Sequence, residues 1–359
     1  MYARSSEKND GSIGMDKNIT VATMQFKNDV KVSTTEYLKT YYTFKLGDIA
    51  FEGHQSKEFR YGRFVENDIG NGIVSHIFAV FRPIQEYDLY FWKYAINNET
   101  LMQRILARST KASTMMHDLV TNDFLNETFL VPSVKEQKQI GAFLNKLDNL
   151  ITLHQRKCEQ TKKLKKYMLQ KMFPQNGAKV PEIRFDGFTY DWEQRKLGDE
   201  AEEILAGGDI DKEKAVDDGV YPIYANALTN DGIVGYYDDY YRVKAPAVTV
   251  TGRGEVGRAR ARMIDFTPVV RLLAVRSNHD CYFLENAINN HKVVVESTGV
   301  PQLTVPQLSS YDICFPKDIV EEKKIGTYFN QLDRLITLHQ RKCDELKKMK
   351  KYMLQNMFI

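Results

Sequence analysis

The chain has 359 residues, of which 43% are hydrophobic and 27% charged, and its formal net charge is +3. This balance is typical of a soluble globular protein with two domains, and no apolar run approaches the roughly 18 residues of a membrane span. The opening MYARSSEKNDG lacks the apolar centre of a secretion signal. Cys158, Cys281, Cys314 and Cys343 lie far apart, so we expect free thiols and a cytoplasmic location.

The first body of the chain is expected to be a mixed α/β domain rich in strands. TYYTFKLGDIAFEG and GIVSHIFAVFRP predict strands, and YFWKYAINN (Tyr90–Asn98) predicts a short helix. The polar stretch HQSKEFRYGR follows the FEG turn directly. It supplies the candidate ligand contacts of this body, Gln55, Lys57, Arg60 and Arg63. Lys111, which follows the Ser109–Thr110 pair, is a weaker candidate.

A long helix follows this body. From Lys135 to Met172 there is no proline, Gly141 is the one glycine, and apolar residues recur with a period near 3.5–3.6. Pro132 and Pro174 stand where helix boundaries favour proline. A second helix is expected from about Glu321 to Met357, and each would span roughly 55 Å. Helices of this length usually pair with a partner of equal length.

The two helices are copies of one sequence. Ile140–Phe173 aligns with Ile325–Phe358 without a gap, and 24 of the 34 positions are identical, including LITLHQRKC in both. The duplication continues upstream with less fidelity, because YFWKYAINN matches YFLENAINN (Tyr282–Asn290) and a Ser-Thr pair recurs at Ser297–Thr298. The segment VPEIRFDGFTYDWEQRKLGDE (Val180–Glu200) has no counterpart in the first half, which we therefore expect to be short at its N-terminus by roughly twenty residues or more.

The second body, like the first, is expected to contain strands such as APAVTVTG and PVVRLLAV. Gly252–Gly257 fits the dinucleotide-binding pattern G-x-G-x-x-G, but RARARMIDF follows it and alternates like a strand, so a hairpin turn is favoured over a cofactor loop. Arg258, Arg260 and Arg262 would lie on one strand face. They are candidate contacts to phosphate or guanine together with Arg253, while a solvated edge strand is the alternative. Asn226 and Gln55 are kept as residues able to read adenine.

The repeated helix segments suggest two further sites. His154 and Cys158 lie one helical turn apart, and His339 and Cys343 repeat this, so a zinc site is conceivable, although a place in the helix seam is favoured and no metal is expected. The basic run Arg156–Lys171 would be a solvated face or a binding surface. Because both helices carry it, two identical partners could bind equivalent patches at these residues: Gln155, Arg156, Lys157, Gln340, Arg341 and Lys342.

An antiparallel pairing of the helices would place one body at each end. Two-fold related readers suit duplex DNA, whose local two-fold axes lie perpendicular to its length. Because the two bodies differ in sequence, the half-sites that they read should also differ.

The whole chain resembles the specificity (S) subunit of type I restriction–modification systems. The resemblance is carried by the LITLHQRKC…KKYMLQ tails, the VPEIRFDGF–DWEQRKLG segment and the lead-ins VPSVKEQKQIG and FPKDIVEEKKIG. It implies two target recognition domains that each read half of a split DNA site. It also implies an antiparallel coiled coil that sets the spacing and docks two methyltransferase (M) subunits, with nuclease/translocase (R) subunits joining them. The S subunit is non-catalytic in that family and needs no cofactor.

The expected organisation has four parts: residues 1–134 and 175–320 as recognition domains, and 135–174 and 321–359 as spacer helices. No methyltransferase or ATP-binding motif is present, so a DNA-modifying enzyme is disfavoured. The alternative is a truncated scaffold or decoy that binds methyltransferase without full DNA specificity.

Overall fold

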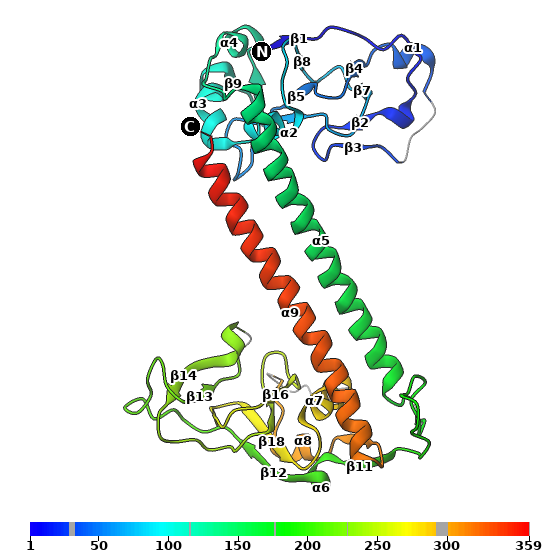
Figure 1. The fold of residues 1–359 in the computed structure, drawn as a ribbon, viewed down its shortest axis with the longest axis vertical. Coiled ribbons are helices and arrows are strands. Elements are labelled where there is room, and N and C mark those ends of the chain that lie inside the picture. The colour runs from blue at the N-terminus through cyan, green and yellow to red at the C-terminus, as the bar shows by residue number, and fades with distance from the viewer. Residues whose placement is uncertain (29–32, 115, 176, 228, 292–300, 359) are drawn as a thin grey trace. The chain divides into compact units, whose positions relative to one another are not determined.

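The two long helices are present, each as one continuous element (Figure 1). Helix α5 (Val134–Met172) has 39 residues and helix α9 (Ile319–Asn356) has 38, which confirms the prediction made from their shared apolar period. In the described part of the chain, no helix is both long enough and apolar enough to cross a lipid bilayer.

The computed structural model describes residues 1–28, 33–114, 116–175, 177–227, 229–291 and 301–358. These residues form two units, which divide both long helices near their midpoints. Unit 1 comprises Met1–Gln155 and Arg341–Ile359, and unit 2 comprises Arg156–Gln340. Each unit thus contains one strand-rich body, part of the helix that follows it and part of the other long helix.

Unit 1 is built on a four-stranded antiparallel sheet in the order β1-β8-β5-β6, with smaller pairs β4-β7, β2-β3 and β9-β10 beside it. One face of the larger sheet packs on helices α2 and α3 and on the adjoining parts of α5 and α9. The strands are β1 (Tyr2–Arg4), β2 (Ile19–Thr20), β3 (Gln25–Phe26), β4 (Tyr42–Phe44), β5 (Ile49–Glu52), β6 (Arg63–Glu66), β7 (Gly72–Val74), β8 (Val80–Pro83), β9 (Thr110–Ala112) and β10 (His117–Leu119). The shorter helices are α1 (Thr35–Leu38), α2 (Leu89–Ala95), α3 (Glu99–Ser109) and α4 (Thr121–Asn126), and the 3-10 helix η1 covers Met15–Lys17.

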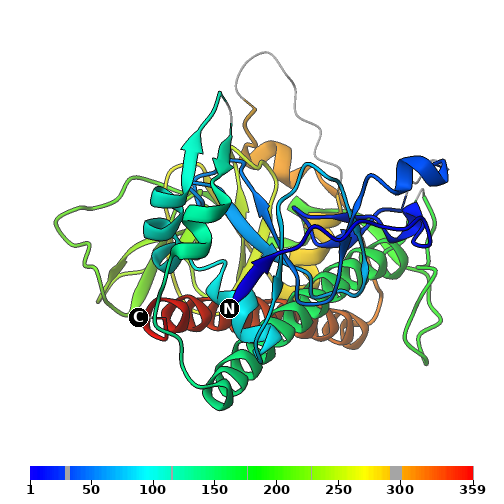
Figure 2. The same ribbon diagram turned by 90° about the horizontal axis from the view of Figure 1, so that it is seen from above.

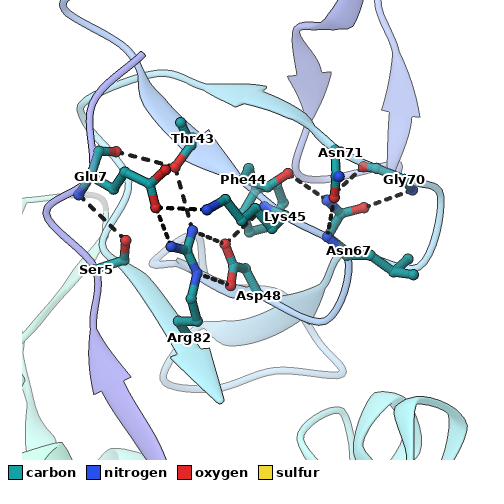
Figure 3. Close-up of polar contacts among 11 residues, drawn as sticks. Ser5, Glu7, Thr43, Phe44, Lys45, Asp48, Asn67, Gly70, Asn71 and Arg82 are labelled. Atoms are coloured by element: carbon teal, nitrogen blue, oxygen red, sulfur yellow. Dashed lines mark hydrogen bonds and ion pairs between the residues drawn. The ribbon is translucent and has the colours of Figure 1, made fainter. Parts of the chain in front are cut away.

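A polar network ties the β4–β5 turn to β8 in unit 1 (Figure 3). The carboxylate of Asp48, which is 1% exposed, accepts from Nε of Arg82 at 2.9 Å and from its Nη2 at 2.8 Å. The same guanidinium binds Glu7, and this hydrogen bond lowers the pKa of Glu7. Nearby, Nδ2 of the buried Asn67 donates to the carbonyl oxygen of Phe44 at 2.8 Å. Asp48, Arg82 and Asn67 thus all have hydrogen-bond partners, which hold the β4–β5 turn against β8.

Unit 2 repeats the sheet of unit 1, with the order β12-β18-β15-β16, and adds the sheets β14-β13-β17 and β11-β19. The strands are β11 (Glu193–Lys196), β12 (Ala201–Ala206), β13 (Tyr221–Tyr224), β14 (Ile233–Tyr237), β15 (Ala247–Thr251), β16 (Ala259–Arg262), β17 (Thr267–Pro268), β18 (Leu272–Ser277) and β19 (Asp312–Phe315). The shorter helices are α6 (Leu197–Glu200), α7 (Cys281–Asn290) and α8 (Val305–Ser309), and the 3-10 segment η2 covers Thr229–Gly232. The repeated strand order extends the duplication seen in the sequence to three dimensions.

Each short helix α2 and α7 docks on a long helix through a glycine. Asp88 caps α2 by accepting from the Phe91 N–H at 2.8 Å, and Asp280 caps α7 by accepting from the Phe283 N–H at 2.9 Å. A Cβ atom on Gly141 would lie 2.2 Å from the Asp88 carboxylate. A Cβ on Gly326 would lie 2.0 Å from that of Asp280. The glycine inside each long helix is therefore required by close approach of a capping aspartate.

Inside each unit the long helices pack side by side. In unit 1, Nζ of Lys350 near the end of α9 donates to Asp148 of α5 at 2.6 Å. In unit 2, Lys165 binds Asp333 at 2.7 Å, and the thiol of Cys158 donates to Gln340 at 3.7 Å. Going along α5 from Cys158 to Lys165, the contacted residue on α9 moves back from Gln340 to Asp333. The packing in unit 2 is therefore antiparallel, as expected.

Candidate nucleic-acid interface

The β5–β6 hairpin of unit 1 carries the candidate contacts of the first body. Its long loop runs from residue 53 to residue 62 and exposes Gln55, Lys57 and Arg60. Arg63 lies in β6 and is held, because its Nε binds Glu52 of β5 at 2.8 Å. The three exposed side chains are therefore better placed to meet a ligand than Arg63.

A second hairpin, β9–β10, stands next to this loop and contains Lys111. Figure 2 shows β9 and β10 as teal arrows that project from α3. Lys111 is exposed in β9 opposite Asp118 of β10, and Nε2 of Gln55 lies 2.7 Å from Nδ1 of His117. A surface hollow next to the two hairpins is lined by Glu52 and His54 of the first, by Met116, His117 and Asp118 of the second, and by His76 from between β7 and β8. This combination of donors and acceptors suits hydrogen bonding to base edges.

In unit 2 the corresponding hairpin is formed by β15 and β16, which pair antiparallel on either side of the Gly252–Gly257 loop. The G-x-G-x-x-G pattern is thus a hairpin turn, as expected, and no helix follows it. Arg253 is half-buried in this loop. Asn226 holds its backbone, because Nδ2 donates to the Arg253 carbonyl at 2.6 Å and Oδ1 accepts from the Arg253 N–H at 3.3 Å. In this arrangement Asn226 positions the loop and has little hydrogen-bonding capacity left for a base.

The three candidate arginines of unit 2 are not equivalent. Arg258 precedes β16, is 57% exposed and binds Glu255 at 2.8 Å. Arg260 is equally exposed and binds Oδ1 of Asp231 at 2.7 Å. Arg262 is 7% exposed, binds Oδ2 of the same carboxylate at 2.8 Å and lies over the Tyr224 ring at 3.7 Å. Burial raises the pKa of that tyrosine, while Arg262 acts in the opposite sense. Arg262 is therefore placed to orient its neighbours, whereas Arg258 and Arg260 can reach a ligand.

The two hairpin loops begin at equivalent glycines. The carbonyl of Gly53 accepts from the His117 N–H at 2.8 Å, and that of Gly252 accepts from the Leu303 N–H at 2.8 Å. A Cβ on Gly53 would lie 2.1 Å from the His117 carbonyl oxygen, and one on Gly252 would lie 2.7 Å from that of Arg271. Gly53 of the FEG turn and Gly252 of the VTG turn thus occupy equivalent positions in the two units. The Ser297–Thr298 pair of the second body lies outside the described residues.

Sequence reasoning missed the carboxylates that hold these arginines. Glu255 stands three positions before Arg258, a spacing visible in the sequence. Asp231 is 31 positions from Arg262, and Glu52 is 11 positions from Arg63, so only the fold brings each pair together. These acids determine which arginines are neutralised before a ligand arrives.

The repeated helix segments present equivalent surfaces in the two units. All six of the expected partner-binding residues are exposed: Gln155, Arg341 and Lys342 in unit 1, and Arg156, Lys157 and Gln340 in unit 2. Beside them, Leu153 in unit 1 is 45% exposed and its counterpart Leu338 in unit 2 is 59% exposed. Each unit therefore exposes two basic residues, one glutamine and one leucine from these segments.

The cysteines of these segments lie in the helix seam. Cys158 is buried in unit 2, and Cys343 is buried in unit 1 near Leu346. Within the described ranges, no group of three or more His, Cys, Asp or Glu side chains is arranged to hold a metal ion. The cysteines thus serve as small apolar residues of the seam.

The family model and the similar proteins all indicate the same family. The type I restriction modification DNA specificity domain matches residues 3–163 and again residues 190–348. A Mycoplasma pneumoniae protein named as a type I specificity subunit is 27% identical over 237 residues, and a second is 30% identical over 148 residues. These matches span 62% and 43% of the two relatives' own lengths. A Methanocaldococcus jannaschii protein named as the specificity subunit of the type I restriction enzyme MjaX is 24% identical over 375 residues, which is 94% of this chain and 82% of that protein.

The fold is also shared with solved structures. The crystal structure of the S subunit of a type I restriction–modification system from M. genitalium matches with a TM-score of 0.64 at 15% identity, covering 100% of this chain and 93% of that one. A chain from a structure concerned with complex assembly of the type I restriction–modification system matches with a TM-score of 0.50 at 15% identity, covering 99% and 96%.

Proposed function

Because the chain belongs to the type I restriction–modification DNA specificity family, with two copies of its domain, we propose that it is a specificity subunit in which each body reads one half of a bipartite duplex DNA site. The observation that carries this proposal is the pair of equivalent hairpins, β5–β6 and β15–β16, on sheets of equal strand order. Their loops differ in length and in side chains. Two sheets of the same strand order that carry different loops would read two different half-sites.

The chemistry of the loops supports a DNA ligand. Lys57 and Arg60 are exposed in unit 1, and Arg258 and Arg260 are exposed in unit 2. Cations of this kind contact phosphates, and arginine also reads guanine through two parallel hydrogen bonds. Gln55 beside His117 supplies an amide for adenine in the same unit. In unit 2, Arg253, Arg262 and Asn226 would hold the loop that presents these groups.

The most direct test is methylome sequencing of a host that expresses this chain with its methyltransferase. We expect one motif made of two unlike half-sites at a fixed spacing. Substituting Arg260→Ala should relax or change one half-site only, and Arg60→Ala should affect the other. A motif without two halves, or a change in both halves from either substitution, would contradict the assignment of one half-site to each body.

The long helices would fix the spacing between half-sites and dock two methyltransferase subunits, through which nuclease subunits join. The support is the equivalence of the exposed surfaces in the two units, at Leu153, Arg341 and Lys342 in one and at Leu338, Arg156 and Lys157 in the other. Identical partners bind identical surfaces. A protein of this role works in the compartment of its DNA, which agrees with the cytoplasmic location expected from the cysteines.

The chain itself would be non-catalytic. Methyl transfer and ATP use would belong to the partner subunits. The purified chain is therefore expected to transfer no methyl groups from S-adenosylmethionine to DNA that contains the target. Transfer by the isolated chain at a rate above that of a heat-denatured sample would overturn this part of the proposal.

A scaffold that docks methyltransferase without reading the first half-site is the second candidate. One observation favours it: among the described residues, no strand pairs with Phe129–Val131 of unit 1, whereas β19 of unit 2 pairs with β11. Gel-shift competition with randomised duplexes separates the candidates. A bipartite reader selects both halves, and a scaffold selects one half or neither.

A further inference from the structure

In unit 1, the β5–β6 loop that carries the candidate DNA contacts also touches the first turn of helix α3. We call this loop, residues 53–62, the reading loop of unit 1. Oε1 of Glu99, the first residue of α3, accepts from the backbone N–H of Arg60 at 3.3 Å. Glu99 also lines a second surface hollow, which is lined in addition by Lys347, Lys350 and Lys351 of α9. Glu99 therefore joins the reading loop to a cluster of lysines on a long helix.

The three lysines of this hollow differ in whether an acid neutralises them. Lys350 is 25% exposed and binds Asp148 at 2.6 Å. Lys347 and Lys351 are exposed, and no carboxylate among the described residues forms an ion pair with either. They stand four positions apart on α9, so their Cβ atoms are about 5–6 Å apart and their side chains leave the same face of the helix. Two neighbouring ammonium groups are thus available to an anion.

Unit 2 has a similar junction, which is built from a different glutamate. Oε2 of Glu285 in α7 accepts from the Ala261 N–H of β16 at 3.1 Å. Burial raises the pKa of Glu285, whereas this hydrogen bond and the charges of Lys165 and Arg260 lower it. One carboxylate in unit 2 therefore lies near the β15–β16 hairpin and near a lysine of α5.

The lysine pair of α9 recurs on α5. In the alignment of the repeated tails, Lys162 corresponds to Lys347, and Lys166 corresponds to Lys351. Both lysines of α5 are exposed, and in the described part of unit 2 neither forms an ion pair with a carboxylate. The hairpin loops differ between the units, but this lysine pair is the same. Such a difference suits two kinds of DNA contact, because base contacts vary with the target and phosphate contacts do not.

We propose that Lys347 and Lys351 in unit 1, and Lys162 and Lys166 in unit 2, bind phosphates of the duplex next to the half-site that the adjoining hairpin reads. The inference rests on the proposed function and adds to it a sequence-independent contact made by the long helices. Lysine suits this role, because its flexible ammonium group neutralises a phosphate beside any base. These phosphates lie on the inner side of each half-site, because the long helices would span the spacer between the two.

An acidic surface of a protein partner is the other class of ligand that such lysines can bind. Duplex DNA is favoured because each lysine pair adjoins a candidate DNA-reading hairpin, through Glu99 in unit 1 and through Glu285 in unit 2. A duplex bound at the hairpin can continue onto the lysines, so one ligand accounts for both surfaces.

The test measures how the affinity of the full chain for duplex DNA depends on salt, without any partner subunit. Each phosphate that a cation neutralises contributes about −0.9 to the slope of the logarithm of the binding constant against the logarithm of the salt concentration. The double substitution Lys347→Gln with Lys351→Gln should therefore make this slope shallower by about 2. The fold-loss of affinity should be equal for the target and for a random-sequence duplex, because both have the same phosphates.

Lys135→Gln with Lys146→Gln is the matched control. It removes the same charge from exposed positions of α5 in unit 1 that do not line the hollow, and the slope should change by less than about 0.5. Methylphosphonate linkages, which carry no charge, locate the contact on the duplex. On the inner side of the half-site that Arg60→Ala affects, they should weaken binding of the unsubstituted chain by about tenfold. They should cause no further loss in the Lys347→Gln, Lys351→Gln variant.

The outcomes separate this inference from the proposed function. An unchanged salt slope in the double variant, with both half-sites still read, would reject the lysine contact alone. A shallower slope without any bipartite motif would reject the reading of half-sites and would retain the contact to phosphate. An unchanged slope together with loss of methyltransferase subunits in native mass spectrometry would identify an acidic protein surface as the ligand and would overturn the inference.

Discussion

At the scale of single residues, carboxylates determine what the arginines of the candidate interface can do. Asp231 binds both Arg260 and Arg262, although only the first of these is exposed. The sequence predicts the alternation of arginines but not this pairing, because the aspartate is remote along the chain. It reaches them through a turn in which Asn230 and Asp231 have φ values of 49° and 55°, a left-handed conformation that Asn and Asp adopt more readily than most residues.

The substitution Asp231→Asn should separate binding from stability. It removes the charge that neutralises Arg260, so the affinity for random-sequence duplex at low salt should rise by roughly threefold to tenfold. The free energy of unfolding should fall by about 1–3 kcal/mol, because the buried Arg262 loses its ionic partner. Anisotropy titration and urea denaturation measure the two effects.

Glu255→Gln is the matched control for this prediction. Glu255 binds Arg258, and both side chains are 57% exposed. It should therefore alter stability by no more than about 0.5 kcal/mol, because exposed ion pairs contribute little. An unchanged affinity for random duplex in Asp231→Asn would show that Arg260 does not face DNA.

His279 should give unit 2 a pH-dependent stability. Burial by itself lowers the pKa of His279, but its hydrogen bonds to Glu322 at 2.8 Å and to Glu200 at 2.9 Å outweigh burial and raise it. Because the folded-state pKa lies above the unfolded one, this stabilisation is fully present below about pH 6.5 and is lost as pH rises through the folded value. His279→Gln should therefore lower the melting temperature more at pH 6 than at pH 9.

The pKa of His291 is shifted in the opposite direction. It stacks on Tyr311 at 4.1 Å between ring centres, and burial lowers its pKa. Its neutral form is favoured in the folded state, so wild-type stability from this group falls as pH drops below about 6.5. His291→Asn should remove that loss at low pH. Equal pH profiles for the two histidine variants would contradict the assignment of His279.

At the scale of elements, the helices and hairpins could be predicted from the sequence, whereas the strand order could not. Helical period and hairpin turns are local patterns, so α5, α9 and the β15–β16 turn followed from them. The order β1-β8-β5-β6 depends on pairing between segments far apart, such as Tyr2 with Pro83. Strand alternation specifies which face is buried but does not name the neighbour.

The glycines in the long helices give a prediction at this scale. Gly141→Ala would stabilise an isolated helix by about 1 kcal/mol. In the protein, its Cβ would meet the Asp88 carboxylate and the Phe91 nitrogen at 2.2 and 2.6 Å. We therefore expect a net loss of about 2 kcal/mol or more in the free energy of unfolding, measured by urea denaturation.

The exposed Gln139 of the same helix is the control, because Gln139→Ala should change stability by less than about 0.5 kcal/mol. Hydrogen exchange should place the effect of Gly141→Ala in α2 of unit 1. Stabilisation by Gly141→Ala would mean that α2 does not approach α5 as closely as described.

At the scale of the whole molecule, the duplication predicts the stoichiometry of assembly. If two methyltransferase subunits dock as proposed, Leu153→Asp should abolish docking of one and Leu338→Asp docking of the other, because each places a charge at an equivalent exposed position. Native mass spectrometry should show one bound subunit for either single variant and none for the double variant.

Ile84→Asp is the matched control, since Ile84 is 63% exposed and lies in a body of the molecule. It should leave two subunits bound. Two bound subunits in the double helix variant would place docking elsewhere. The number of bodies and their alternation with helices followed from the repeat alone, whereas contacts between distant segments, such as Asp231 with Arg262, emerged only from the structure.

The division of the chain has a consequence for the order of synthesis. Unit 2 is one uninterrupted stretch, whereas unit 1 takes its last part from Arg341–Ile359. The core of unit 1 includes Cys343 and Leu346, and Asn98 donates to the carbonyl of Leu354. The body that leaves the ribosome first therefore cannot complete its core until the codons of residues 341–359 are translated. A stop codon at position 341 would remove part of the core of unit 1, whereas unit 2 would keep all of its residues.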